Sequence, residues 1–183
     1  MADVSPEGKV ITKILVEDLK TKKSHLLNMT VKAQKDGPLR MDVTTSVGIH
    51  LFSLVTTDEG VEYILVRQKK YYRGENSEMA MKPILNMPLD PNHLRNLIFQ
   101  MPIADKDWSC TDQEGVLRDC LNMRRRIKVM WKKDKSDRPL IDIRYSRRAR
   151  VQINVRDVSE FDGDPEKTFK LKVPKSFKKV RIL

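Results

Sequence analysis

Apolar and polar side chains alternate along most of this 183-residue chain. Between positions 27 and 33, Leu27, Met29, Val31 and Ala33 alternate with polar residues. A period of two is typical of a β-strand that buries one face. The same alternation, or a short apolar run, predicts further strands at 39–43, 49–55, 61–65, 69–73, 106–112, 116–122, 124–132, 138–146, 149–157 and 166–173.

Short turn sequences separate these segments, such as Asp36-Gly37-Pro38 and the stretch 162–165. Consecutive strands joined by short turns pair in antiparallel fashion, so the pattern indicates a meander that forms a barrel or a sandwich. The stretch 49–55 is apolar on both sides, which predicts a strand covered on both faces. We expect residues 1–9 to form a flexible tail and residues 10–183 to form one domain.

Two segments break the alternation and predict short helices, at 77–86 and 91–100. In the first, apolar residues recur at a helical spacing. The second follows Asp90, a favourable N-cap, and has Pro91 at its first position. Pro102 ends this second helix. Its apolar side chains share one face, and they are Leu94, Leu97, Ile98 and Met101.

The chain carries a formal net charge of +11, which favours contact with a polyanion. Most of the charge alternates with apolar residues and predicts a solvated outer face of the sheet. Two arginine clusters exceed this background and form a candidate basic patch: Arg124, Arg125, Arg126, Arg144, Arg147, Arg148 and Arg150. An anionic membrane surface and a nucleic acid both fit such a patch. Aromatic residues make up only 6% of the chain, which argues against a platform for stacking bases.

The sequence contains no glycine-rich phosphate loop and no catalytic motif. Its three histidines are far apart in sequence, so we expect no enzymatic activity, no cofactor and no metal site. Cys110 and Cys120 lie equally far from Gly115, within a predicted hairpin turn. Across such a hairpin the two cysteines can face each other and form a disulfide. Two separate thiols are the alternative.

Several motifs resemble the bacterial LolA/LolB family, whose LolB members are outer-membrane lipoprotein receptors. The stretch 38–54, PLRMDVTTSVGIHLFSL, resembles the strand, apolar protrusion and returning strand of LolB. The stretch 85–102, LNMPLDPNHLRNLIFQMP, resembles the helical lid of the family. Residues 168–173 and 180–182 resemble its last strands. The similarity spans residues 24 to 183.

The resemblance implies a mainly β fold: an unclosed antiparallel barrel of ten or eleven strands, with short helices forming a lid over an apolar cavity. In the family this cavity receives the acyl chains of lipoproteins. Val47, beside Gly48, falls where the family has an exposed apolar residue, usually Leu, that contacts the membrane. The matching cavity positions are Met41, Val43, Leu51, Leu65, Leu94, Leu97, Ile98, Phe99, Ile127, Val129, Ile141 and Ile143.

The resemblance also implies partners and a location. The expected partners are acylated lipoproteins or another lipid, a periplasmic carrier protein and the anionic surface of the outer membrane, and we expect a monomer. The expected location is the periplasmic face of the outer membrane, through a lipid anchor whose signal and acylated Cys lie outside this sequence. Two alternatives stay open: a basic nucleic-acid-binding barrel, and an envelope lipid sensor of the same fold.

Overall fold

The computed structural model describes residues 7–85 and 87–182, and most of them lie in one twelve-stranded sheet. Its strands are β1 (Gly8–Asp18), β2 (Lys23–Ala33), β3 (Leu39–Thr45), β4 (His50–Thr57), β5 (Gly60–Leu65), β6 (Lys70–Gly74), β7 (Trp108–Gln113), β8 (Val116–Asn122), β9 (Ile127–Lys133), β10 (Pro139–Tyr145), β11 (Ala149–Ser159) and β12 (Lys178–Arg181). The helical segments are α1 (Lys82–Leu85), the 3-10 turn η1 (Pro91–His93), α2 (Leu94–Ile98) and α3 (Pro165–Thr168).

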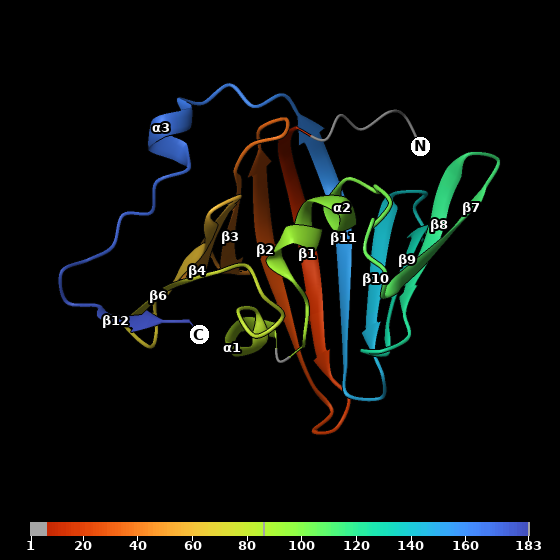
Figure 1. Ribbon diagram of the computed structural model, residues 1–183, viewed down its shortest axis with the longest axis horizontal. Coiled ribbons are helices and arrows are strands. Elements are labelled where there is room, and N and C mark those ends of the chain that lie inside the picture. Colours follow the sequence, from red (N-terminus) through yellow and green to blue (C-terminus); the bar gives the residue numbers. More distant parts are fainter. Residues whose placement is uncertain (1–6, 86, 183) are drawn as a thin grey trace.

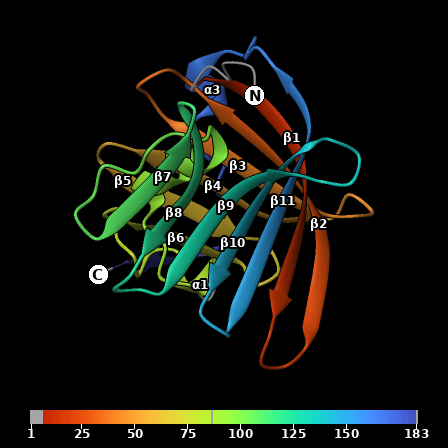
Figure 2. The same cartoon turned by 90° about the vertical axis from the view of Figure 1, so that its right-hand side faces the viewer.

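The strand order is β12-β6-β5-β4-β3-β2-β1-β11-β10-β9-β8-β7. Every neighbouring pair is antiparallel except β12 with β6, which is parallel. The pairing of β1 with β11 joins the two halves of the chain, and the strands fan from β2 round to β7 (Figure 2). Because β12 and β7 are the two edges of the sheet, the barrel is unclosed. The predicted mainly β fold, an unclosed barrel, is confirmed.

The core lies on the concave face because the strand register places the inward side chains in rows. Met29 on β2 faces Val43 on β3. On the other side of β1, Ile143 on β10 lies between Val129 on β9 and Val151 on β11. All five side chains are buried in a single hydrophobic cluster. The inward side chains of the alternating strands therefore form one continuous apolar wall on the concave face.

The crossover from β6 to β7 carries α1 and α2 across this concave wall (Figure 1). Asp90 caps the start of this helical segment, because its carboxylate accepts a hydrogen bond of 2.8 Å from the Asn92 N–H. Leu94, Leu97 and Ile98 turn toward the sheet and are buried. The two predicted helices therefore exist, but they are shorter than expected. None of the helices within the described residues is long and apolar enough to cross a bilayer.

Two expectations about the ends of the chain need correction. The strand predicted at 166–173 is absent, and α3 stands at its start because Asp164 accepts from the Glu166 N–H and Pro165 occupies the first turn. The first strand begins at Gly8, so positions 8 and 9 of the predicted tail belong to the sheet. Residues 1–6 of that tail lie outside the described residues. The sheet has twelve strands rather than ten or eleven.

The C-terminal segment returns across the convex face of the sheet. Arg40 on β3 donates a hydrogen bond of 2.7 Å to the Thr168 carbonyl, and Leu171 in this segment is buried. On the neighbouring strand β4, both Leu54 and Val55 are buried although they point to opposite faces. Of the stretch 49–55 predicted to be covered on both faces, the later part is therefore covered on both, whereas Ile49 at its start is exposed in the β3–β4 turn.

A disulfide joins Cys110 on β7 to Cys120 on β8. The two residues are direct cross-strand partners in the edge hairpin. Of the two alternatives that the sequence left open, the structure has the bonded form. The bond ties the outermost strand of the sheet to its neighbour.

Candidate ligand cavity

An apolar cavity of about 380 Å³ lies between the concave face of the sheet and the α1–α2 crossover. Its volume falls within the range of about 300–1,000 Å³ that is usual for small-molecule sites. Strands β1 to β4, β10 and β11 supply its walls, with Ile14, Val16, Leu27, Met29, Met41, Val43, Leu51, Phe52, Ile143, Val151 and Ile153. The crossover supplies its roof, with Ile84, Leu85, Met87, Leu89, Leu94, Leu97 and Ile98.

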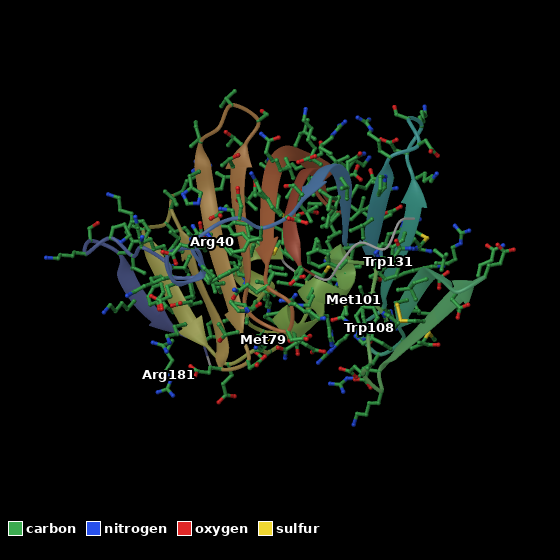
Figure 3. All side chains as sticks on the ribbon, turned by 90° about the horizontal axis from the view of Figure 1, so that it is seen from above. Arg40, Met79, Met101, Trp108, Trp131 and Arg181 are labelled. Carbon is green, nitrogen blue, oxygen red and sulfur yellow. A yellow bond between two sulfur atoms is a disulfide. The ribbon has the colours of Figure 1, made fainter. Side chains whose placement is uncertain are left out.

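Three side-chain hydrogen bonds hold the roof of the cavity, which we also call the lid, to the sheet and its turns. Trp131 on β9 donates its indole N–H to the Leu97 carbonyl at 3.0 Å. Arg95 donates to the Gly37 carbonyl at 2.7 Å, and Gln100 donates to the Leu117 carbonyl at 2.6 Å. Seen from above, Met101 and Trp131 lie beside this helical segment, inside the arc of the sheet (Figure 3). The α2 part of the roof is therefore fixed to both sides of the barrel.

The polar residues of the cavity lining lie at one end of the barrel, and we call it the mouth end. The turns β1–β2, β3–β4, β5–β6, β8–β9 and β10–β11 all lie there, because successive strands run in opposite directions. The polar residues among the described lining are His25, Thr45 and Arg67, and all three belong to these turns or adjoin them. Polar lining at one end of an apolar cavity marks the place where the cavity meets water.

The sequence-predicted cavity residues divide into two groups. Seven of them line the cavity: Met41, Val43, Leu51, Leu94, Leu97, Ile98 and Ile143. The other five are buried in the surrounding core without lining it: Leu65, Phe99, Ile127, Val129 and Ile141. On the β9 side the large Trp131 side chain reaches α2, so inward residues there pack against side chains and not against open space.

The structure also adds wall residues that sequence analysis missed. Ile14 and Val16 come from β1, whose alternation is irregular, and Leu27 and Met29 come from the paired strand β2. The alternation at 27–33 pointed to Leu27 and Met29 as inward residues. Sequence spacing alone does not say which inward residues have empty space beside them.

Val47 occupies the tip of the β3–β4 turn, and its side chain is 80% exposed. Gly48 follows it with a positive φ of 86°, a conformation that glycine adopts without strain. Ile49 beside it is 60% exposed. Leu19 and Met123, in two other turns of the mouth end, are also exposed. Exposed apolar side chains therefore gather around the opening of the cavity, whereas Val158 is exposed at the far end.

The arginines of the predicted basic patch separate into different surroundings. Arg124, Arg125, Arg126 and Arg148 line a polar pocket at the mouth end, and Arg147 is exposed in the β10–β11 turn. Arg144 and Arg150 instead bind the carboxylate of Asp142, at 3.1 and 2.9 Å. Lys132 donates to the same carboxylate at 2.8 Å.

Asp142 is fully buried on β10. Burial alone would raise the pKa of this carboxyl, but the hydrogen bonds from Arg150, Lys132 and Arg144 outweigh burial and hold its pKa well below the usual range. Asp142 points to the opposite face from Ile141 and Ile143, because side chains alternate along a strand. This cluster is therefore a structural ion network, and Arg144 and Arg150 are occupied within it.

A second network links Asp42, Ser53 and His50 on β3 and β4. The Ser53 hydroxyl donates a short hydrogen bond to the Asp42 carboxylate, and His50 Nε2 lies 2.9 Å from the Ser53 Oγ. In a catalytic Ser-His-Asp triad the histidine stands between the other two, whereas here the serine does. Ser53 is 1% exposed, and none of the three residues lines the cavity. Their order and burial do not fit nucleophilic catalysis.

The described residues contain no group of three or more His, Cys, Asp or Glu side chains placed to hold a metal ion.

The fold is similar to those of several solved structures. It matches a domain assigned to outer membrane lipoprotein sorting from Vibrio parahaemolyticus with a TM-score of 0.53, at 8% identity over 91% of both chains. A LolA superfamily protein from Nitrosomonas europaea matches with a TM-score of 0.46, at 8% identity over 90% of both chains. A conserved protein from Thermus thermophilus matches with a TM-score of 0.48, at 10% identity over 96% of this chain and 91% of that one.

No protein-family model and no curated protein sequence matches the chain. At 8% identity the likeness to the Vibrio domain shows a shared fold. The fold that the LolA/LolB resemblance implied is therefore shared with this Vibrio domain.

Proposed function

We propose that this protein shelters an acyl chain, of a lipoprotein or another lipid, in the cavity under α2, and that it does so without catalysis. The apolar cavity, whose polar lining residues all lie at the mouth end, is the observation that carries the proposal. The Vibrio domain with the same fold is assigned to lipoprotein sorting, which supports the same class of ligand.

The energetics of an acyl chain fit such a cavity. Each buried methylene contributes about 0.8 kcal/mol, so the ligand strongly prefers a continuous apolar lining to water. Of the described lining residues, only His25, Thr45 and Arg67 are polar, and they adjoin the opening. The methionines Met29, Met41 and Met87 in the lining are unbranched and flexible, which suits chains of varying shape.

In the same proposal, the mouth end of the barrel delivers the acyl chain to the outer membrane. In this proposal Val47 and Gly48 contact the bilayer, and the basic side chains of the mouth end face an anionic surface, where each contributes about 1 kcal/mol. A periplasmic carrier would load the cavity. The Cys110–Cys120 disulfide supports an oxidising compartment such as the periplasm.

A nucleic acid is a weaker candidate partner on this surface. The exposed large hydrophobic side chains of the described residues are Leu, Val, Ile and Met, without an aromatic. Proteins that hold single-stranded nucleic acids combine a basic groove with exposed aromatic rings on which the bases stack, and such rings are missing from these exposed hydrophobic side chains. The mouth end therefore suits a lipid surface better than a row of bases.

Direct binding of an acyl ligand tests the proposal. Protein stripped of co-purified lipid is titrated with a fluorescent fatty acid, and an acylated peptide then competes for the site. We expect saturable binding at one site and full displacement by the acylated peptide, with no release by the same peptide lacking its acyl chain. If neither ligand binds the stripped protein, the proposal fails.

Val47→Glu tests the membrane contact separately from the cavity. Replacing an exposed apolar tip by a carboxylate removes the insertion and repels anionic lipid, so we expect transfer of the acyl probe to anionic vesicles to slow about fivefold, for a loss of about 1 kcal/mol. The affinity for the probe should stay unchanged. Val158→Glu, at the far end of the barrel, is the matched control and should transfer at the wild-type rate. Equal slowing of both variants would refute a specific role for Val47.

A further inference from the structure

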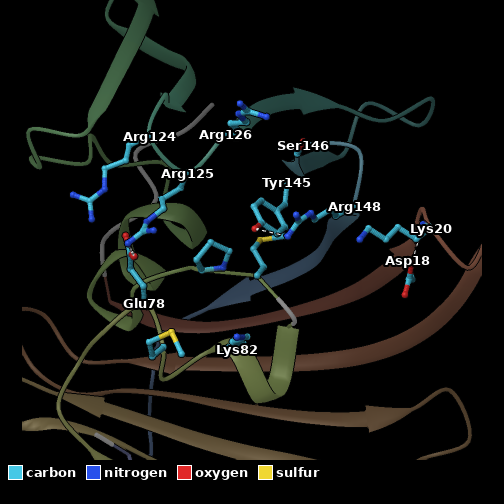
Figure 4. A pocket seen from close by; sticks show the side chains of 13 residues that line it. Asp18, Lys20, Glu78, Lys82, Arg124, Arg125, Arg126, Tyr145, Ser146 and Arg148 are labelled. Atoms are coloured by element: carbon cyan, nitrogen blue, oxygen red, sulfur yellow. Dashed lines mark hydrogen bonds and ion pairs between the residues drawn. The ribbon is translucent and has the colours of Figure 1, made fainter.

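A second, polar pocket of about 500 Å³ adjoins the acyl cavity at the mouth end (Figure 4). It is formed by the β1–β2, β8–β9 and β10–β11 turns together with the segment that contains α1. Its charged lining residues are six cations, Lys20, Lys82, Arg124, Arg125, Arg126 and Arg148, and two acids, Asp18 and Glu78. Cations from three hairpins and one helix thus converge on one space.

The two acids of this pocket are already engaged. Glu78 forms a close ion pair with Arg125. Asp18 accepts hydrogen bonds from the backbone N–H groups of Lys20 and Thr21, at 2.9 and 3.0 Å. These contacts fix the acids within their own turns and leave the pocket with an excess of positive charge.

Four of the six pocket cations are free of direct ion pairs with carboxylates of the described residues. Arg124 is paired with Asp107, and Arg125 with Glu78. Among the described residues no carboxylate forms a direct ion pair with Lys20, Lys82, Arg126 or Arg148, although the charge of Lys20 acts on the nearby Asp18 carboxylate. Arg148 rests on the ring of Tyr145, with its guanidinium carbon 5.7 Å from the ring centre, which orients it without neutralising it. Against the one negative charge of Asp18, these four cations leave the pocket net positive, which favours a ligand with negative charge.

The polar pocket and the acyl cavity share a wall. Met87 lines both of them. From the α1 segment, Ile84 and Leu85 line the cavity, whereas Lys82 lines the polar pocket. A molecule whose chain lies in the cavity can therefore place its head in the polar pocket by passing the end of α1.

We propose that this pocket binds the phosphate-bearing headgroup of the same amphiphile whose acyl chain occupies the cavity. The inference rests on the proposed acyl-binding function and adds the chemical class of the head: a phosphate monoester or diester rather than a neutral glycerol. Guanidinium groups bind phosphate through paired N–H···O hydrogen bonds. Arg126 and Arg148 each place one guanidinium group in the lining of the pocket. Lys20 and Lys82 add point charges.

The test compares two ligands that differ only in the phosphate. Lauroyl lysophosphatidic acid and monolaurin, both kept below their micelle concentrations, compete for the cavity against the uncharged dye N-phenyl-1-naphthylamine. We expect the phosphate-bearing ligand to displace the dye at a concentration about tenfold lower. At about 1 M salt this preference should largely vanish, because the Debye length is then about 3 Å.

Charge reversal in the pocket gives the matched variants. In Lys82→Glu/Arg126→Glu/Arg148→Glu the two ligands should displace the dye equally, while the dye itself binds as in the wild type and so reports an intact cavity. Lys35→Glu/Lys135→Glu/Lys175→Glu changes the net charge equally at exposed positions outside the pocket. This control should keep the tenfold preference.

The outcomes separate the two proposals. If neither lipid displaces the dye, the acyl-binding function fails, and this inference fails with it. If both lipids bind equally well to the wild type at low salt, only the headgroup inference is overturned. Calorimetry with inorganic phosphate alone should show no tight binding. Tight binding of inorganic phosphate that persists when monolaurin fills the cavity would assign the pocket to free phosphate and overturn the headgroup inference.

Discussion

Replacing Ile143 with glutamate is expected to weaken acyl-chain binding at least about 30-fold, for a cost of at least about 2 kcal/mol. Ile143 lines the cavity from β10 and is 4% exposed. A carboxylate at this position can stay hydrated while the cavity is empty, but a bound acyl chain would desolvate it. The variant should therefore fold but bind the acyl chain much more weakly than the wild type. Titration with the fluorescent fatty acid measures the effect, and urea unfolding checks the fold.

Two controls separate the cavity from the core around it. Ile143→Met keeps an apolar side chain of similar size, so its affinity should stay within about twofold of the wild type. Val129 faces Ile143 across the β9–β10 pair and is fully buried, but it does not line the cavity. Val129→Ala should lower the free energy of unfolding by about 1–2 kcal/mol without changing the affinity. A wild-type affinity in Ile143→Glu would place the ligand elsewhere.

Replacing Asp142 with alanine is expected to lower the free energy of unfolding by about 3 kcal/mol at neutral pH. Its buried carboxylate accepts hydrogen bonds from three cationic side chains: Lys132, Arg144 and Arg150. Removing it leaves those charges facing one another across β9, β10 and β11. Urea unfolding of the wild type and the variant measures the difference. Ligand affinity should not change, because Asp142 lies on the convex face, away from the cavity.

The stabilisation by Asp142 should also depend on pH in one direction. Because the folded-state pKa of this carboxyl is depressed, its contribution is fully present above the unfolded-state pKa of about 3.9 and is lost as the pH falls toward the folded value. The difference between wild type and Asp142→Ala should therefore shrink steadily below about pH 4. Lys133→Ala removes an exposed ion pair with Asp137 and should leave stability almost unchanged. A difference that grows on acidification would contradict this account of the network.

Most of the sheet could be predicted from the sequence because one face of nearly every strand is buried. Strand β2 alternates strictly, with Met29, Val31 and Ala33 inward, and sequence analysis located it. Strand β1 was missed because its apolar residues come in runs, as in Val10-Ile11, and because Thr12 takes an inward position. The Thr12 hydroxyl there donates to the Met29 carbonyl, and a register shift follows Ile11. Irregular pairing of this kind leaves no periodic signal.

The cavity could be predicted only in part. Alternation identifies the inward side chains. Whether empty space lies beside them depends on where the large side chains pack inside the barrel. Trp131 reaches the lid on the β9 side, and Ile127 and Val129 on the same strand are buried without lining the cavity. The grouping of Arg126 and Arg148 with Lys20 and Lys82 was also beyond sequence reasoning, because these residues belong to three different turns and to α1.

Contact between an acyl chain and the cavity wall is the most direct test of the central claim. In an isotope-filtered NOE spectrum of methyl-labelled protein with an unlabelled fatty acid, the methylene protons of the ligand should show cross-peaks to methyl groups of Leu94, Leu97, Ile98 and Ile143. Methyl groups of Ile127 and Val129, which are equally buried outside the cavity, should show none. Cross-peaks confined to exposed residues, or absent from the lid and from Ile143, would contradict the account.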